Sequence, residues 1–151
     1  MKNLVRTIGK VNLPQMKIKP GLHAKGPQDI ATLSRPISNQ EQEFLIVFNL
    51  KGTYEVTSAT IVAIGDRNVT VCPQCQVFKS AIAEGAAGIV IVHNHPSGTL
   101  KLSKVDKRSI KQWLKIGALL EIAIIDAMVV TEDRWRSYGW LAKDGKRNKK
   151  S

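Results

Sequence analysis

The sequence is short of cysteine and of long apolar runs. Its 151 residues include only two cysteines, which excludes the disulfide framework of a small secreted domain and a zinc site built from four thiolates. No apolar run approaches the roughly 20 residues that cross a membrane, and the first residues lack the apolar stretch of a signal peptide. We therefore expect a cytoplasmic protein without a membrane span.

Aromatic residues are also scarce, at 5% of the chain. The three tryptophans are scattered along the sequence, so we expect them to pack in the core and at its rim, and not to stack on nucleic-acid bases. The two cysteines form the pattern Cys72-Pro73-Gln74-Cys75, where a strand passes into a helix. That placement occurs in redox-active pairs, but the surrounding order of elements favours two reduced, partly buried thiols.

Acidic residues are nearly absent from both ends of the chain. The net charge is +11, yet residues 29–142 carry twelve basic and eleven acidic side chains and are almost neutral. The excess lies in residues 1–28, with six basic side chains and no acid, and in the last residues. We predict a basic N-terminal arm (1–28), a single compact domain (29–142) and a basic C-terminal tail (143–151).

Basic arms on a neutral domain are typical of contact with nucleic acid, although solvated tails have the same composition. A cationic face on a predicted helix favours the contact, because nucleic acids are bound largely through their phosphates. This face consists of Lys104, Lys107, Arg108, Lys111 and Lys115. Nucleic acid is therefore one predicted partner, through the arms and this helix face.

Two imidazoles, a hydroxyl and a carboxylate lie within fourteen residues, at His93, His95, Ser103 and Asp106. The preceding run, residues 88–92, is typical of a buried strand, so the two histidines face the same side. A helix is predicted to begin at Ser103, which lets Asp106 turn back toward the imidazoles. Three protein ligands predict a hydrolytic Zn²⁺ site with one position left for water, and we assign Ser103 to stabilising the oxyanion.

The segment from Ser103 to Asp106 is also a capping-box pattern, which is common at the start of helices. A helical period places Asp106 on the same face as Ile110, Trp113 and Gly117, the apolar side of the helix. A purely capping acid has no need to point inward, so this spacing favours the ligand role. Paired histidines at a strand end can likewise be packed and hydrogen-bonded without metal.

The rest of the pattern predicts an α/β domain in which strands alternate with helices. A short helix is expected from residue 27 until Pro36 stops it, and a later one from 104 to 116 is expected to end at Gly117. Another helix is predicted to run to residue 83, capped by Gly85. Strands are predicted at residues 43–50, 54–64, 68–71, 88–92, 122–130 and 134–140, the first two as a hairpin.

The motif His93-x-His95, seven residues, Ser103, two residues, Asp106 resembles the JAMM (JAB1/MPN+) metalloprotease motif. The run His-Asn-His-Pro-Ser-Gly is similar to the RadC-like branch of that superfamily, and the similarity extends from about Asp29 to Leu141. The resemblance implies an α/β fold of the JAMM/MPN+ (cytidine-deaminase-like) type, with a mixed sheet flanked by helices. It also implies a Zn²⁺-dependent metallopeptidase or isopeptidase with a peptide or protein substrate. The helix-hairpin-helix module of full-length RadC proteins has no counterpart here, so we expect a short, stand-alone version.

The sequence departs from the RadC-like pattern at two places. The segment expected to carry the general-base glutamate, residues 58–65, has no acid, and Glu55 is the nearest carboxylate upstream. Glu55 is then either the base or an ordinary solvent-facing strand glutamate. The family commonly shows Asp-His where this chain has Asp126-Ala127, so the histidine is missing. Asp126 itself either hydrogen-bonds a ligand histidine or is a strand-end turn acid.

Three functions follow from these observations. The first is a zinc-dependent hydrolase, for which the RadC resemblance brings an association with DNA repair and mobile elements. The second is an accessory protein of nucleic acids with a vestigial or structural zinc site. The third is a protein-interaction scaffold, like the catalytically silent members of the superfamily.

Overall fold

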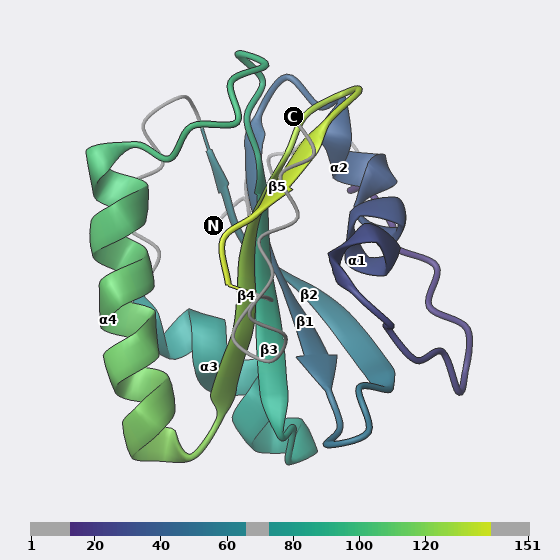
Figure 1. Ribbon diagram of the computed structural model, residues 1–151, viewed down its shortest axis with the longest axis vertical. Helices are drawn as coiled ribbons and strands as arrows, with labels where there is room; N and C mark the ends of the chain where they lie inside the picture. Colours follow the sequence, from purple (N-terminus) through teal and green to yellow (C-terminus); the bar gives the residue numbers. More distant parts are fainter. Residues whose placement is uncertain (1–12, 66–72, 140–151) are drawn as a thin grey trace, which may run out of the picture.

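The computed structural model describes residues 13–65 and 73–139, which form a mixed five-stranded sheet with helices on both sides (Figure 1). The strands lie in the order β2-β1-β3-β4-β5. The pair β3 and β4 is parallel, and the other neighbouring pairs are antiparallel. The strands are β1 (Glu43–Leu50), β2 (Val56–Gly65), β3 (Gly88–Asn94), β4 (Ala123–Val130) and β5 (Trp135–Ser137). This arrangement confirms the predicted fold class.

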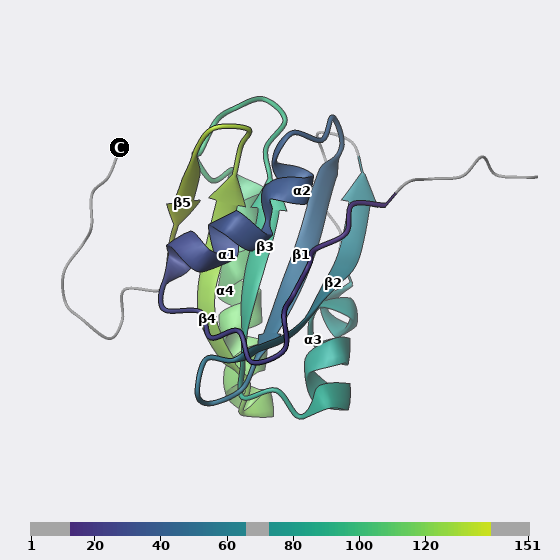
Figure 2. The ribbon, with the colours of Figure 1, turned by 90° about the vertical axis from the view of Figure 1, so that its right-hand side faces the viewer.

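The helices form two layers (Figure 2). One face of the sheet carries α1 (Pro27–Leu33) and α2 (Arg35–Ser38), and the other carries α3 (Gln74–Glu84) and α4 (Lys104–Leu120). Successive residues of β3 alternate between the two apolar cores, because side chains of a strand point to opposite faces. Val90 and Val92 belong to the core under α1, whereas Ile89 and Ile91 belong to the core under α3 and α4. His93 continues the second series and therefore faces α4.

Helix α4 runs past Gly117, where the sequence predicted its end. The helix is capped instead by Glu121, whose φ of 56° is left-handed. A Cβ atom at Gly117 would lie 2.6 Å from the carbonyl oxygen of Ile122. The glycine is therefore explained by close packing against the chain that enters β4, and not by a helix end.

Contrary to the prediction from the sequence, Pro36 does not end the first helix. Helix α1 already ends at Leu33, and Pro36 lies at the start of α2, where its missing N–H group is tolerated. The hairpin of β1 and β2 is confirmed, as is Gly85 in the left-handed conformation after α3. Helix ends depend on local packing as well as on local sequence, which explains why two of the three predicted helix ends differ.

The second half of the predicted N-terminal arm belongs to the folded domain. The Val56 N–H donates to the Leu22 carbonyl at 2.8 Å, and the Ala24 N–H donates to the Tyr54 carbonyl at 2.9 Å. Ala24 is buried, and residues 16 and 18 pack against the core under α1. The folded domain therefore begins before the boundary predicted at residue 28.

Several predictions concern residues outside the described ranges. These are the strand at residues 68–71, Cys72, Trp140, the first twelve residues of the arm and the tail at 143–151. Cys75 is exposed and forms no disulfide within the described part, so it is not the partly buried thiol that was expected. In residues 13–65 and 73–139, no helix is both long and apolar enough to cross a bilayer.

Candidate metal centre

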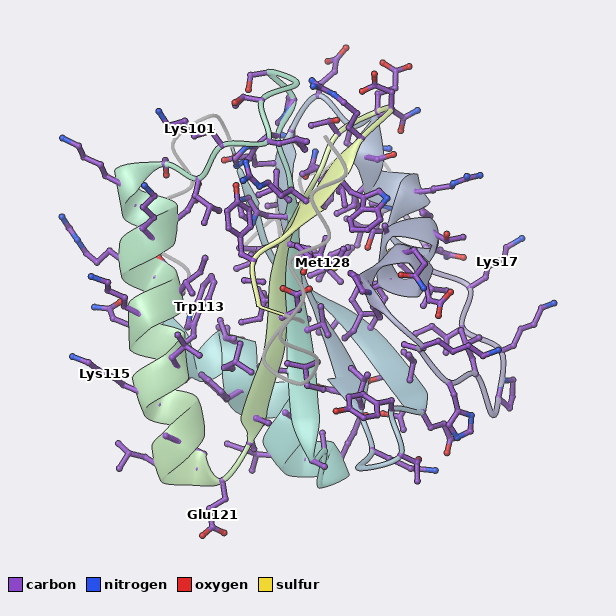
Figure 3. All side chains as sticks on the ribbon, viewed as in Figure 1. Lys17, Lys101, Trp113, Lys115, Glu121 and Met128 are labelled. Atoms are coloured by element: carbon purple, nitrogen blue, oxygen red, sulfur yellow. The ribbon has the colours of Figure 1, made fainter. Side chains whose placement is uncertain are left out.

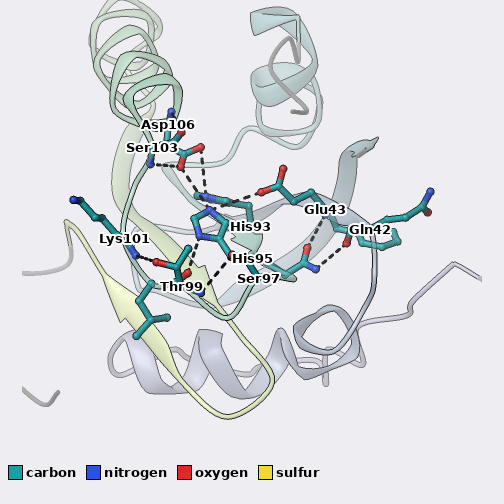
Figure 4. A network of polar contacts seen from close by, with 12 residues as sticks. Gln42, Glu43, His93, His95, Ser97, Thr99, Lys101, Ser103 and Asp106 are labelled. Atoms are coloured by element: carbon teal, nitrogen blue, oxygen red, sulfur yellow. Dashed lines mark hydrogen bonds and ion pairs between the residues drawn. The ribbon is translucent and has the colours of Figure 1, made fainter. Parts of the chain in front are cut away.

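The three predicted ligands converge at one end of the sheet. His93 lies at the end of β3, His95 follows the strand, and Asp106 lies in the first turn of α4. One ligand atom of each lies within 4.8 Å of the others. Figure 4 shows the two imidazoles and the carboxylate pointing toward one another. The period-2 and helical arguments from the sequence therefore place these side chains together, as expected.

The distances fit a metal ion better than direct hydrogen bonds. Asp106 Oδ1 lies 3.6 Å from His93 Nε2, and Asp106 Oδ2 lies 3.6 Å from His95 Nε2. Such separations are too long for hydrogen bonds. Ligand atoms around a tetrahedral Zn²⁺ lie about 3.3–3.4 Å apart when each bond is about 2.0–2.1 Å long. The three donors thus have nearly the spacing that a small divalent cation requires.

The orientation of the imidazoles supports the same interpretation. His95 Nδ1 lies 2.8 Å from the Thr99 carbonyl oxygen, so this nitrogen donates its proton and Nε2 keeps a lone pair directed into the cluster. His93 Nε2 is buried and has no hydrogen-bond partner among the described residues. A buried nitrogen without a partner is unfavourable, and a metal ion would satisfy it.

The position of Asp106 is compatible with both of the roles that the sequence left as alternatives. Its Oδ2 accepts from the Ser103 N–H at 2.7 Å, and its own N–H donates to Ser103 Oγ at 3.0 Å, which completes a capping box. The same carboxylate faces both histidines. The helix start therefore positions the ligand, because the cap fixes the direction of the Asp106 side chain.

The electrostatics of the cluster favour a cation. Burial opposes ionisation of Asp106, but the neighbouring His93 and His95 imidazoles outweigh it and hold the pKa of this carboxyl well below its usual range. Burial also opposes protonation of His95, whereas the Asp106 carboxylate and the Thr99 carbonyl raise the pKa of this imidazole above its ordinary value. A proton and a metal ion compete for the same lone pairs, so a site that attracts one attracts the other.

Comparison with known proteins agrees with this geometry. Residues 24–145 match the RadC-like JAB domain family. The chain belongs to this family. A UPF0758 protein of Chlorobium chlorochromatii is 33% identical over 106 residues, which are 70% of this chain and 48% of that protein. A UPF0758 protein of Methanosarcina mazei is 32% identical over 120 residues, or 79% of this chain and 52% of that protein. The chain spans about half the length of the curated relatives it matches.

In this RadC-like JAB domain, a carboxylate that the sequence analysis missed lies beside the predicted ligands. Glu43 opens β1, and its Oε1 lies 3.8 Å from His95 Nε2. The strand register explains the proximity, because Leu45 pairs with His93 and the continued ladder brings Glu43 opposite His95. Burial raises the pKa of Glu43, and the nearby imidazoles partly offset this effect. The sequence did contain an indication of this position. Glu43, Leu45 and Val47 are spaced two residues apart in one strand, so Glu43 lies on the same face as the other two, which face the core under α3 and α4.

Asn94, between the two histidines, holds this part of β1 in place. Its side-chain oxygen accepts from the Phe44 N–H at 2.6 Å, and its amide group donates to the Gln42 carbonyl at 2.8 Å. The side chain is fully buried and points to the face opposite His93. The loop that carries both imidazoles therefore also fixes the strand end that carries Glu43.

Glu55, the sequence-based candidate for the base, is not at this site. It precedes β2 at the hairpin turn, and its Oε2 lies 2.8 Å from Lys51 Nζ. This ion pair lowers the pKa of Glu55. The length of β1, roughly 23 Å at about 3.3 Å per residue, separates the turn from Glu43. Glu55 is thus the ordinary strand glutamate of the two alternatives, and the assignment of the base to it is corrected.

Asp126 does not contact the histidines either. It is buried in β4, where its Oδ1 accepts from the Gly139 N–H at 2.6 Å and from the Tyr138 N–H at 3.0 Å. Its Oδ2 accepts from the Ser137 hydroxyl. Burial raises the pKa of Asp126, although these donors oppose the effect. These hydrogen bonds therefore hold the end of β5 against β4.

Proposed function

We propose that this chain is a zinc-dependent hydrolase that cleaves amide bonds in a peptide or protein substrate. The observation that carries the proposal is the convergence of His93, His95 and Asp106 with the Glu43 carboxylate beside them. Two nitrogen donors and one oxygen donor suit Zn²⁺, and three protein ligands are typical of catalytic rather than structural zinc sites. A Zn²⁺ ion bound there would supply a water molecule with a pKa near 7 and would polarise the amide carbonyl.

The protein side chains then have defined tasks. His93, His95 and Asp106 hold the metal, and the Thr99 carbonyl fixes the ring of His95. Glu43 accepts a proton from the attacking water and delivers it to the leaving nitrogen, a task for which its place beside the candidate ligands suits it. Ser103 uses its oxygen as the acceptor of the Asp106 N–H, so its hydroxyl proton is left for a developing oxyanion.

The proposal is tested by measuring metal content and turnover on the full chain. We expect about one Zn²⁺ per chain by mass spectrometry, and release of new amino groups from a library of peptides and lysine-linked isopeptides. Chelation should abolish the release and Zn²⁺ should restore it. Bound zinc without turnover of any library member would contradict the hydrolase and favour the accessory or scaffold function. Absence of zinc would contradict the metal site itself.

The two roles of Ser103 can be separated by replacing it with alanine or glycine. We expect Ser103→Ala to lower the free energy of unfolding by about 1 kcal/mol, and Ser103→Gly by only a few tenths, because glycine is a tolerated N-cap. Both variants lack the hydroxyl, so turnover should fall equally in both, by roughly 10²–10³-fold. Chemical denaturation and kcat are the measurements. Unchanged turnover in both variants would leave Ser103 with the capping role alone.

A second candidate function, contact with nucleic acid, is favoured by the cationic face of α4. Its five cations, Lys104, Lys107, Arg108, Lys111 and Lys115, are all exposed. Within the described ranges, none of them forms an ion pair. Figure 3 shows Lys115 extending away from α4 into solvent, while Trp113 points toward the sheet. Such a face suits phosphates, which bind by charge without reading sequence.

Removing two of these charges should change the salt dependence of binding. If Lys107 and Lys111 each neutralise a phosphate, the double alanine variant should make the negative slope of log K against log salt shallower by about 1.8 for duplex DNA. Fluorescence anisotropy with a labelled duplex at several salt concentrations measures this slope. The variant Lys51→Ala/Lys79→Ala removes the same charge elsewhere and should leave the slope unchanged. An equal change in both variants would mean that only net charge matters.

A further inference from the structure

A cleft of about 320 Å³ opens directly beside the candidate metal centre. Glu43, His93 and Asp106 form part of its lining. From there it extends between α4 and the sheet, toward the start of α3. Its walls are partly apolar, and their aliphatic side chains include Leu45, Ile91, Val105 and Ile110.

Besides His93, two residues that line this cleft have a buried polar atom without a partner in the described part of the chain. One of these atoms is the indole nitrogen of Trp113, a side chain whose residue is only 6% exposed. The other is the Oε1 atom of Gln74, at the first residue of α3. The amide nitrogen of Gln74 is already used, because it donates to Gln112 Oε1 at 2.9 Å. Buried polar groups are nearly always hydrogen-bonded, so this pair calls for an explanation.

The two atoms have complementary chemistry. The indole N–H can only donate a hydrogen bond, and the carbonyl oxygen of Gln74 can only accept one. A carboxylate or phosphate offers acceptors alone, and an ammonium group offers donors alone. A hydroxyl group offers both on one oxygen, whereas a neutral amide offers a donor and an acceptor on two separate atoms, and an aliphatic group attached to the amide matches the apolar part of the walls. A site of this kind, apolar with a few fixed polar groups, is typical of a ligand pocket.

We propose that this cleft is a specificity subsite for an aliphatic, amide-bearing group of the substrate. The substrate carbonyl accepts from the Trp113 indole N–H, and the substrate N–H donates to Gln74 Oε1. This proposal rests on the proposed function: if the chain is a hydrolase, the subsite selects the substrate residue next to the bond that is cleaved. Recognition of the amide itself requires no metal, so the two proposals can fail separately.

Three probes of equal shape test the recognition: pentanamide, butyl methyl ketone and pentanoate. The ketone keeps the acceptor but has no donor, and pentanoate replaces the donor with a negative charge. Binding to the full chain is measured by saturation-transfer NMR and by the shift of the Trp113 indole N–H resonance, which Trp113→Phe assigns. Because one neutral hydrogen bond changes affinity by roughly 3–10-fold, we expect pentanamide to bind that much more tightly than the ketone.

The variants decide whether the named atoms are responsible. Gln74→Leu should abolish the preference for pentanamide over the ketone, and Trp113→Phe should weaken pentanamide binding by a similar factor. Gln76→Leu, an exposed glutamine of the same helix, should change neither. His95→Ala should keep the preference even without zinc, which separates this test from that of the hydrolase. A preference for pentanoate, which would place an anion site at Arg108 on the cleft edge, would overturn the proposal. Equal affinity for all three probes, or a preference that survives Gln74→Leu, would overturn it as well.

Discussion

Replacing Glu43 with glutamine is expected to lower kcat by 10²–10⁴-fold while zinc stays bound. Glutamine has nearly the same shape as glutamate, but it cannot accept a proton, and a positioned general base contributes an effect of this size. Zinc binding should persist, because Glu43 is not one of the three converging candidate ligands and its Oε1 lies 3.8 Å from His95 Nε2. The measurements are single-substrate kinetics and zinc content of the same preparation.

Glu55→Gln is the matched control for this experiment. It makes the same chemical change at the hairpin turn, where the carboxylate pairs with Lys51. We expect its kcat and zinc content to equal those of the unchanged protein. A loss of activity in Glu55→Gln with full activity in Glu43→Gln would return the base to the position predicted from sequence. Loss of zinc in Glu43→Gln would make Glu43 a ligand and not a base.

The second large effect is expected from His95→Ala, which should abolish tight zinc binding. Removing even an outer partner of a zinc ligand typically weakens metal affinity 10–100-fold, and loss of a ligand itself is more severe. Zinc at about 100 times its dissociation constant should stabilise the unchanged protein by about 2.7 kcal/mol. For a domain of this size that corresponds to a rise in Tm of about 10 °C, and His95→Ala should show none.

His23→Ala is the control for the loss of a histidine. His23 is exposed, and its Nδ1 pairs with the Gly21 carbonyl far from the cluster in the fold. Thermal unfolding with and without zinc, together with competition by a chelator, compares the two variants. A zinc-dependent rise in Tm that survives in His95→Ala would mean that the metal binds elsewhere. A rise that disappears in both variants would point to a general loss of stability.

Local patterns predicted that the three ligand candidates converge, because their geometry depends on short stretches of chain. A period of two brings His93 and His95 to one side, and a capped helix start turns Asp106 back toward them. The same kind of reasoning chose Glu55 as the candidate base, whereas the carboxylate beside the histidines is Glu43, because that position depends on which strands pair and in which register. Glu43 and His95 are 52 residues apart in the sequence, and only the antiparallel pairing of β1 with β3 brings them together.

Helix ends and pockets were similarly outside the reach of sequence patterns. Gly117 has the composition of a helix end, yet its small size serves the contact with Ile122. The unpaired atoms of Trp113 and Gln74 could not be recognised, because burial is a property of the packed molecule. What the sequence determined by itself was the α/β class, the family and the three metal-ligand candidates, since strand alternation, helix period and motif spacing are local. The tertiary structure alone decided which carboxylate faces the histidines and where a cleft opens beside them, because both depend on contacts between distant segments.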